Sequence, residues 1–466
     1  MNKRVIFALA FILSIGAFFV LPVDDDFYYF TAPHADLCLK DLLPHKPFWR
    51  PFDVLFGVFL GKCPTLFPYL NHAIVLAGFA YSIYGLNKIL NYCGTTKTSQ
   101  NIALAMFCLS PALVATTFSV DSSNQSLSLA LGIASLIYFE KHKCWSYTLM
   151  ILAVFAKESG IAWFAITPLL NLLIQYRHSN ISQPIAQNIK SLIRPWCISL
   201  CIIAVYAIAR IYLDTHIGQS ADSNGRYSTG IGVNSLVGFG MILTSAITSI
   251  DTIALFLEKN WFIVTISTIV SAAFLFIIIK KISWREHYSL IILAICVLAI
   301  SSPHLVMQHP GEMHVYPTLW MIALSFGLQT FGWTKRELSV MYIYFACSIL
   351  VFIHKGYYIY NIGKIAASRV QSVIGGQART IPNKVLILDC DPQLDTYSVF
   401  QTNRKKSWDG GKGTRVYWDL KKPEHIDYKV INPQQLKQNL TMYKKSPKGK
   451  YDVCWIVKSY KVQIVE

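Results

Sequence analysis

Apolar stretches of about 18–20 residues recur along most of the first 356 residues, and they restrict the fold more than any other feature. A helix of that length crosses the hydrocarbon core of a bilayer. Only 14% of the residues are charged, whereas an ordinary soluble domain carries about a quarter. The sequence therefore predicts an all-α polytopic membrane protein and excludes a soluble enzyme with a single anchor.

We expect about eleven transmembrane helices within residues 1–356. A first outer loop at 24–64, part of it amphipathic, is expected to hold interfacial helices. The apolar stretch 233–257 is flanked by charged residues, which favours a surface-lying or re-entrant segment, but whether it spans stays open. The expected spans are 5–22, 67–90, 102–118, 126–139, 145–156, 160–176, 195–213, 261–279, 288–302, 315–331 and 338–354.

The net charge of +17 is explained mainly by topology. Short basic clusters fall between the apolar stretches, and placing all of them in the cytoplasm satisfies the positive-inside rule with one alternation. We therefore expect a cytoplasmic N-terminus, an inner (plasma) membrane location, membrane lipids as neighbours, and no nucleic-acid partner. The clusters are Lys3/Arg4, Lys88/Lys97, Lys141/Lys143, Arg177/Lys190/Arg194, Lys280/Lys281/Arg285 and Lys335/Arg336.

The composition becomes polar after the last span. We expect a linker at 357–379 and a small soluble α/β domain at 380–466, outside the membrane. The segments "NKVLILDC" and "YDVCWIVKSYKVQIV" have the apolar, β-branched composition of strands. The basic surface of this domain either binds anionic lipid or is simply solvated. A disulfide between Cys390 and Cys454 is one alternative for these two residues.

Polar residues of both signs gather in the turns that this topology assigns to the outer face. Mixed charges on one face are typical of a site for an anionic substrate, and ionisable groups at membrane depth are functional candidates because they are costly. The candidates are Asp24, Asp25, Asp26, Arg50, Asp121, Asn124, Lys157, Glu158, Arg226, Tyr227, Glu312, His314 and Tyr316.

Each candidate also has a structural alternative. The aspartate run could mark topology, Lys157 and Glu158 could form a salt bridge in a tight helical hairpin, and "WRP" could anchor at the interface. A divalent metal at the histidines around Glu312 is not favoured, because the His309-x-x-Glu312-x-His314 spacing matches no zinc pattern. We therefore expect no metal and no cofactor.

Four short motifs together resemble the GT-C glycosyltransferases, multi-span enzymes that use polyprenyl-phosphate-linked sugars. They are "DDDFYYF", "FWRPF", "AKESG" and "GEMHVYP". The protein O-mannosyltransferase branch, and bacterial relatives that modify lipid A or O-antigen, are the most similar. The resemblance implies a GT-C-like fold and transfer of a sugar from a polyprenyl-phosphate donor to a hydroxyl of a glycolipid, glycan or protein, with inversion.

The resemblance also implies roles for the candidates. One of Asp24–Asp26, with Asp25 first and Asp24 next, would be the general base, because the acceptor hydroxyl must lose a proton. Arg50, Lys157 and Arg226 would stabilise the leaving phosphate, and the other polar side chains would orient sugar or acceptor. Two other classes stay open: a transporter or flippase of lipid-linked sugars, and an O-antigen ligase or polymerase. A structural membrane protein without catalysis is a further alternative.

Overall fold

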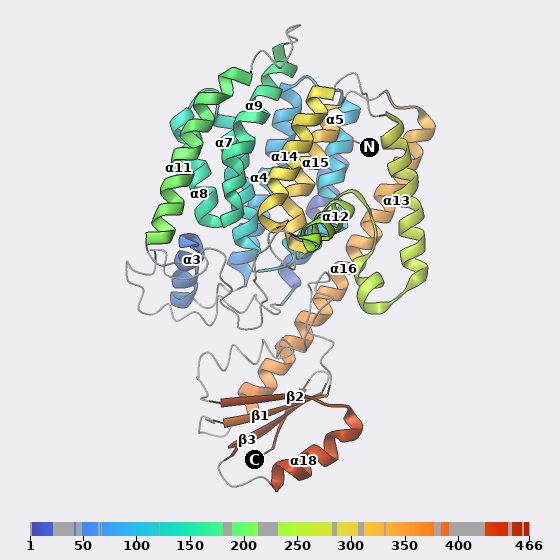
Figure 1. Ribbon diagram of the computed structural model, residues 1–466. Coiled ribbons are helices and arrows are strands. Elements are labelled where there is room, and N and C mark those ends of the chain that lie inside the picture. The colour runs from blue at the N-terminus through green and yellow to red at the C-terminus, as the bar shows by residue number, and fades with distance from the viewer. Residues whose placement is uncertain are drawn as a thin grey trace.

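The computed structural model describes residues 2–21, 42, 49–63, 66, 68–120, 122–179, 189–212, 232–281, 287–305, 312–329, 332–376, 384–390, 425–445, 450–458 and 461–465. The chain is mostly helical, and a four-stranded sheet lies near the C-terminus (Figure 1). The helices of the bundle are α1 Lys3–Ile15, α3 Pro51–Lys62, α4 Tyr69–Tyr92, α5 Lys97–Cys108, α6 Val114–Thr117, α7 Ser123–Tyr138, α8 Lys143–Ala156, α9 Trp163–Ser179, α11 Ile193–Tyr212, α12 Val233–Ile247, α13 Trp261–Lys281, α14 His287–Leu305, α15 Val315–Leu328 and α16 Lys335–Gly376.

Among the described residues, six helices are long and apolar enough to cross a membrane. They are Tyr69–Tyr92 (α4), Glu158–His178 (mainly α9), Lys190–Ile211 (mainly α11), Trp261–Lys281 (α13), Tyr288–Leu305 (α14) and Lys335–Ile365 (the first part of α16). The pair Lys97–Cys108 and Pro111–Thr117 adds a seventh span if it counts as one bent helix. Each of the eleven expected segments lies on a helix, but α7, α8 and α15 are shorter than a span. The long apolar helices are compatible with a multi-pass membrane protein.

Short helices connect the main ones at the points where the chain turns. Pro111 explains the 40° bend between α5 and α6, because proline lacks the N–H that a continuous helix needs. The Ser110 hydroxyl accepts from the Ala112 N–H and so caps the new segment. The connecting elements are η1 Gly16–Phe19, η5 Pro111–Leu113, η6 Glu158–Ala162, η7 Ile189–Leu192, η8 Ala254–Glu258 and η10 Glu312–His314.

The bundle core forms around α7 and α15. Gly78 of α4 and Gly132 of α7 allow close helix contact, since a β-carbon at either would lie within 2.4 Å of Ser126 or Trp163 atoms. The Ser126 hydroxyl donates to the Val75 carbonyl at 2.7 Å, which satisfies both groups away from water. Helix α15, with 14 residues, is buried along nearly its whole length by the surrounding helices.

Polar contacts distinguish two ends of the bundle. At the end that we call the amino end, Lys3 Nζ donates to Asn87 and Gln100, and Tyr92 donates to Glu140. At the end that we call the sheet end, Arg50 pairs with Glu158, Thr116 donates to the Met313 carbonyl, and Glu312 pairs with Lys355. Figure 1 shows α3 and the sheet beyond this second end.

Helix α16 connects the bundle to the sheet. At 1.5 Å per residue its 42 residues extend about 63 Å, roughly twice the hydrocarbon thickness of a bilayer. The prediction placed the end of this helix at residue 354 and a linker at 357–379, whereas the helix continues to Gly376. The composition became polar there because the second half leaves the bundle, and a polar helix has the same hydrogen bonding as an apolar one.

The strands are β1 Lys384–Asp389, β2 His425–Val430, β3 Val453–Lys458 and β4 Lys461–Val465, in the order β2-β1-β3-β4. Strand β1 is parallel to β2 and β3, and β4 is antiparallel to β3. The strands β1 and β3 are nearly continuous apolar runs because a central parallel strand is covered on both faces. Helix α18 (Leu436–Lys444) packs against them through Leu436, Leu440 and Tyr443. Cys390 and Cys454 are free, so the disulfide alternative is wrong.

Candidate functional site

Five polar side chains from three distant segments meet at the sheet end. Arg50 immediately precedes α3, Asp53 lies in its first turn, and Asn124 lies in the first turn of α7. Lys157 and Glu158 follow α8, where the chain leaves the helix in an extended conformation before η6 begins. We call Arg50, Asp53, Asn124, Lys157 and Glu158 the arginine cluster.

The arginine cluster is joined by direct contacts. Arg50 Nε donates to Glu158 Oε2 at 2.8 Å, and its Nη1 lies 3.8 Å from Asp53 Oδ2. The Asn124 amide donates to Asp53 Oδ2 at 3.3 Å and accepts from Lys157 Nζ at 3.5 Å. Burial raises the pKa of the Asp53 carboxyl, while the Arg50 charge and the Asn124 bond lower it.

A pair of histidines lies close to this cluster. The rings of His304, at the end of α14, and His314, in η10, stack with centroids 4.3 Å apart. Burial, and then the positive charges of His304, Lys157 and Arg50, hold the pKa of His314 well below its ordinary value of about 6.5. His314 is therefore a neutral imidazole at neutral pH, able to donate one hydrogen bond and accept another.

Two polar atoms of this region lack a hydrogen-bond partner among the described residues. They are His304 Nε2 and Glu158 Oε1, and both are shielded from solvent. Burying such atoms without a partner costs on the order of 1–3 kcal/mol each, so proteins usually satisfy them with water or ligand. The region beside the arginine cluster is therefore suited to a hydroxyl-bearing ligand, whose O–H can donate to the Glu158 carboxylate.

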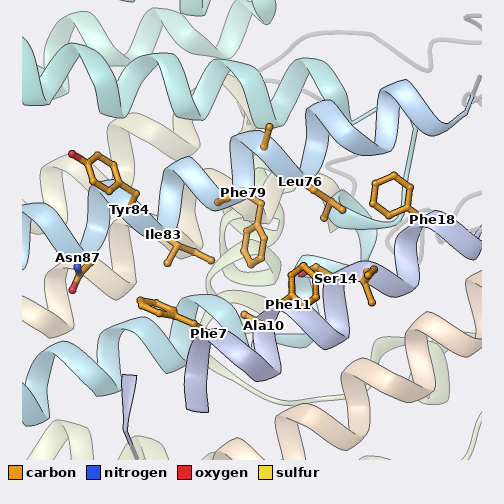
Figure 2. A pocket seen from close by; sticks show the side chains of 13 residues that line it. Phe7, Ala10, Phe11, Ser14, Phe18, Leu76, Phe79, Ile83, Tyr84 and Asn87 are labelled. Atoms are coloured by element: carbon orange, nitrogen blue, oxygen red, sulfur yellow. The ribbon is translucent and has the colours of Figure 1, made fainter. Parts of the chain in front are cut away.

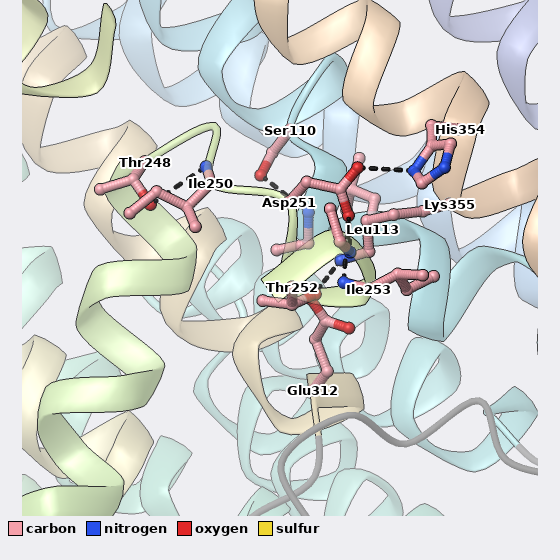
Figure 3. Close-up of polar contacts among 12 residues, drawn as sticks. Ser110, Leu113, Thr248, Ile250, Asp251, Thr252, Ile253, Glu312, His354 and Lys355 are labelled. Atoms are coloured by element: carbon pink, nitrogen blue, oxygen red, sulfur yellow. Dashed lines mark hydrogen bonds and ion pairs between the residues drawn. The ribbon is translucent and has the colours of Figure 1, made fainter. Parts of the chain in front are cut away.

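A second group of charges, the lysine cluster, consists of Asp251, Thr252, Glu312, His354 and Lys355 (Figure 3). Lys355 of α16 pairs with Glu312 of η10, and both side chains are only 2% exposed. The Thr252 hydroxyl donates to Glu312 Oε1 at 3.0 Å. His354 Nδ1 lies 2.6 Å from Asp251 Oδ2, and Asp251 Oδ1 accepts from two backbone N–H groups.

The non-helical stretch 248–251 after α12 brings Asp251 into this cluster. After α12 the chain runs extended for a few residues, and Asp251 then caps the next helical turn with its carboxylate. For this segment the sequence favoured a surface-lying or re-entrant arrangement and left open whether it spans, and α12 is shorter than the helices that are long enough to cross a membrane. The apolar residues of this segment surround the buried Asp251 carboxylate.

The structure brings some sequence-predicted residues together and separates others. Arg50, Asn124, Lys157 and Glu158 meet in the arginine cluster, whereas Glu312 belongs to the lysine cluster. His314 stacks on His304. Tyr316, expected to orient substrate, is fully buried in the core, and its hydroxyl donates to Ser82 at 3.3 Å. Asp24, Asp25, Asp26, Asp121, Arg226 and Tyr227 lie outside the described residues.

Sequence reasoning missed Asp53, Asp251, Thr252, His354 and Lys355. The available signal was a charge inside an apolar run, since Asp251 interrupts residues 233–257 and Lys355 ends the last apolar stretch. Within the described residues no three His, Cys, Asp or Glu side chains gather as a metal site. His309, part of the expected spacing, is outside those residues.

Comparison with known proteins adds no family to this geometry. No protein-family model, no curated protein and no solved structure matches the chain.

Proposed function

We propose that this protein is an integral membrane glycosyltransferase that moves a sugar from a polyprenyl-phosphate-linked donor to a hydroxyl acceptor. The observation that carries the proposal is the arginine cluster: two cations from segments 107 positions apart in the chain lie beside two carboxylates, an amide and a neutral histidine. A leaving phosphate needs fixed cations, and a sugar needs carboxylate, amide and imidazole partners for its hydroxyls.

In the proposed reaction the acceptor oxygen attacks the anomeric carbon while the bond from that carbon to the phosphate oxygen breaks. The acceptor proton passes to a carboxylate of Asp24–Asp26, with Asp25 as the first choice, and the polyprenyl phosphate departs with the bonding electrons. Attack from the face opposite the phosphate inverts the anomeric centre. Arg50 and Lys157 stabilise the negative charge on the departing phosphate, and Arg226 is proposed to assist them.

Other residues are proposed to orient substrates. Glu158, whose Oε1 has no partner among the described residues, and neutral His314 are suited to sugar hydroxyls. A further part in orienting the sugar or the acceptor is proposed for Asp121, Tyr227 and Glu312. Lys355 holds the Glu312 carboxylate in place. No metal or other cofactor is needed for this scheme. The acceptor is a glycolipid, glycan or protein in contact with the same face of the membrane.

The proposal includes a topology. Eleven helices cross the inner (plasma) membrane, the N-terminus lies in the cytoplasm, and the sheet end with both clusters faces outward. The basic clusters of the amino end, including Lys3, Lys88 and Lys143, support this orientation through the positive-inside rule.

The test is an assay of membranes with a labelled polyprenyl-phosphate sugar, comparing wild type with Asp25→Asn, Arg50→Ala and Lys157→Ala. We expect each variant to lose transfer by roughly 100-fold or more, because each removes a proton acceptor or a phosphate cation. Lys143→Ala, at the exposed start of α8 on the amino end, is the matched control and should keep full activity. Full transfer by all three variants would show that the site is wrong.

A parallel measurement separates the other classes. If proteoliposomes moved the lipid-linked sugar across the bilayer without a covalent product, the protein would be a transporter. If only an assembled lipid-linked oligosaccharide served as donor, it would be a ligase or polymerase. We expect neither result, because the described charges of the arginine cluster gather at one end of the bundle and not at its middle.

A further inference from the structure

An apolar groove with a volume of about 620 Å³ runs between α1 and α4, away from both clusters. Figure 2 shows Phe7, Phe11 and Phe18 from the amino-terminal segment facing Leu76, Ile83 and Tyr84 of α4. The groove is open on one side, since the Phe11 side chain is 66% exposed and Tyr84 is 51% exposed. The α4 residues from Leu76 to Asn87 cover about 16 Å of helix axis, half of a bilayer's hydrocarbon thickness.

One end of this groove is polar and positively charged. Asn87 lines it, and Lys3 Nζ donates to the Asn87 side chain at 2.8 Å. Lys88 Nζ donates to the Tyr84 hydroxyl at 3.2 Å, and Tyr84 also lines the groove. Two ammonium groups on different helices therefore lie at the same end of the apolar groove. Arg4 and Lys97 are exposed nearby.

An apolar groove that ends at two lysines is complementary to an amphiphile with an apolar chain and a negatively charged head group. The groove excludes water from its walls, so it favours a hydrocarbon chain, and the lysines favour a phosphate near the membrane surface. The sugar donor is not the ligand expected here, because its phosphate belongs with Arg50 and Lys157 at the opposite end of the bundle. A phospholipid of the leaflet at the amino end fits both the depth and the charge.

We propose that the groove between α1 and α4 is a binding site for an anionic glycerophospholipid, with an acyl chain in the groove and its phosphate at Lys3 and Lys88. The bound lipid fixes α1 against α4, two helices whose contact the groove otherwise leaves incomplete. This site is independent of the proposed transferase chemistry and uses none of its residues.

The test uses the full chain purified in a mild detergent. Thermal unfolding is measured with added phosphatidylglycerol and with phosphatidylcholine of the same acyl chains, and native mass spectrometry counts the bound lipid. We expect phosphatidylglycerol to raise the unfolding temperature by about 5 °C and to bind one molecule, and phosphatidylcholine to do neither.

Three variants separate the site from general charge effects. The pair Lys3→Ala with Lys88→Ala should lose at least half of the shift, whereas Lys143→Ala with Lys335→Ala, which removes equal charge from exposed positions, should retain it. Ala80→Phe fills the groove and keeps both lysines, so it should also lose the shift even if the lysine pair folds poorly. An unchanged shift in the lysine pair and in Ala80→Phe, or an equal shift with phosphatidylcholine, would overturn the proposal.

Discussion

At the scale of single residues, the most demanding contact in the protein is the ion pair between Glu312 and Lys355. Both side chains are 2% exposed, so each charge depends on the other and on the Thr252 hydroxyl in place of water. Removing one partner leaves a buried charge uncompensated, whereas an exposed pair can lose one partner at little cost.

We therefore predict that Lys355→Met lowers the free energy of unfolding by about 3–5 kcal/mol, and that the double variant Lys355→Met with Glu312→Leu recovers most of this loss. The measurement is thermal or denaturant unfolding of the purified protein. The matched control is Lys281→Met, because Lys281 and Glu337 form a pair at 3.0 Å whose side chains are 23% and 18% exposed, and its loss should cost less than about 1 kcal/mol. A double variant as unstable as Lys355→Met would contradict this account.

His314 gives a prediction about pH. Its folded-state pKa lies well below the unfolded value of about 6.5, because burial and the charges of His304, Lys157 and Arg50 oppose protonation. The unfolded chain therefore binds more protons, and stability falls as pH drops below about 6.5, by up to about 1.4 kcal/mol per pH unit for this one group.

His314→Gln should make the dependence of unfolding temperature on pH shallower below about 6.5, with no change above it. His142→Gln is the control, because His142 is exposed at the start of α8 and should leave the profile as it is. Equal slopes for wild type and His314→Gln would mean that His314 does not stay neutral in the fold.

How much of the site could be predicted depends on what each residue's position reveals. Arg50, Lys157 and Glu158 could be found because they interrupt apolar composition on one expected face. Asp53 could not be singled out, since its partner Asn124 lies 71 positions away and the pairing depends on where α3 meets α7. Lys355 looked like an ordinary basic residue after a span, because no pattern shows that α16 continues past it.

At the scale of elements, hydropathy predicted where helices occur better than where they end. The helix after residue 338 continues to Gly376 because hydrogen bonding, and not apolarity, sustains it. The segment 102–118 is broken at Pro111, which has no N–H to donate to a continuous helix. An average of hydropathy over a window does not detect such a single residue. The extended chain before Asp251 has no such marker, so the break after α12 followed only from tertiary contacts.

Gly160 is an element-scale constraint that can be tested. It turns the chain between α8 and α9, and a β-carbon there would lie 2.4 Å from the backbone of Ala153. We predict that Gly160→Ala destabilises the protein by about 1–3 kcal/mol and weakens proposed transferase activity, because the hairpin that holds Lys157 and Glu158 must shift.

Gly240→Ala is the matched control for this substitution. Gly240 lies within α12 and an added β-carbon there meets nothing within 4 Å, so alanine should be neutral or stabilising by up to about 1 kcal/mol. Both variants are compared by thermal unfolding and by sugar transfer. Equal stability for the two alanine variants would show that the close contact at Gly160 is not a real constraint.

At the scale of the whole molecule, the two ends of the bundle have different chemistry. The amino end carries Lys3, Arg4 and Lys88, whereas the sheet end carries charges of both signs in the two clusters. An electric asymmetry of this kind is what orients a multi-span protein during insertion. The 42-residue α16 then determines on which side the sheet lies, since it passes through the bundle and continues beyond the sheet end.

This arrangement predicts opposite sides for two reporter fusions. A fusion after Gly94, in the turn between α4 and α5 at the amino end, should place the reporter in the cytoplasm, and a fusion after Val465 should place it outside. Alkaline phosphatase, which is active only outside, should therefore be inactive at the first position and active at the second. A fluorescent protein that fails to fold outside is the control, and it should give the reverse pattern. If both phosphatase fusions were active, or both inactive, the proposed orientation would be contradicted, because the two fusion points would then lie on the same face of the membrane.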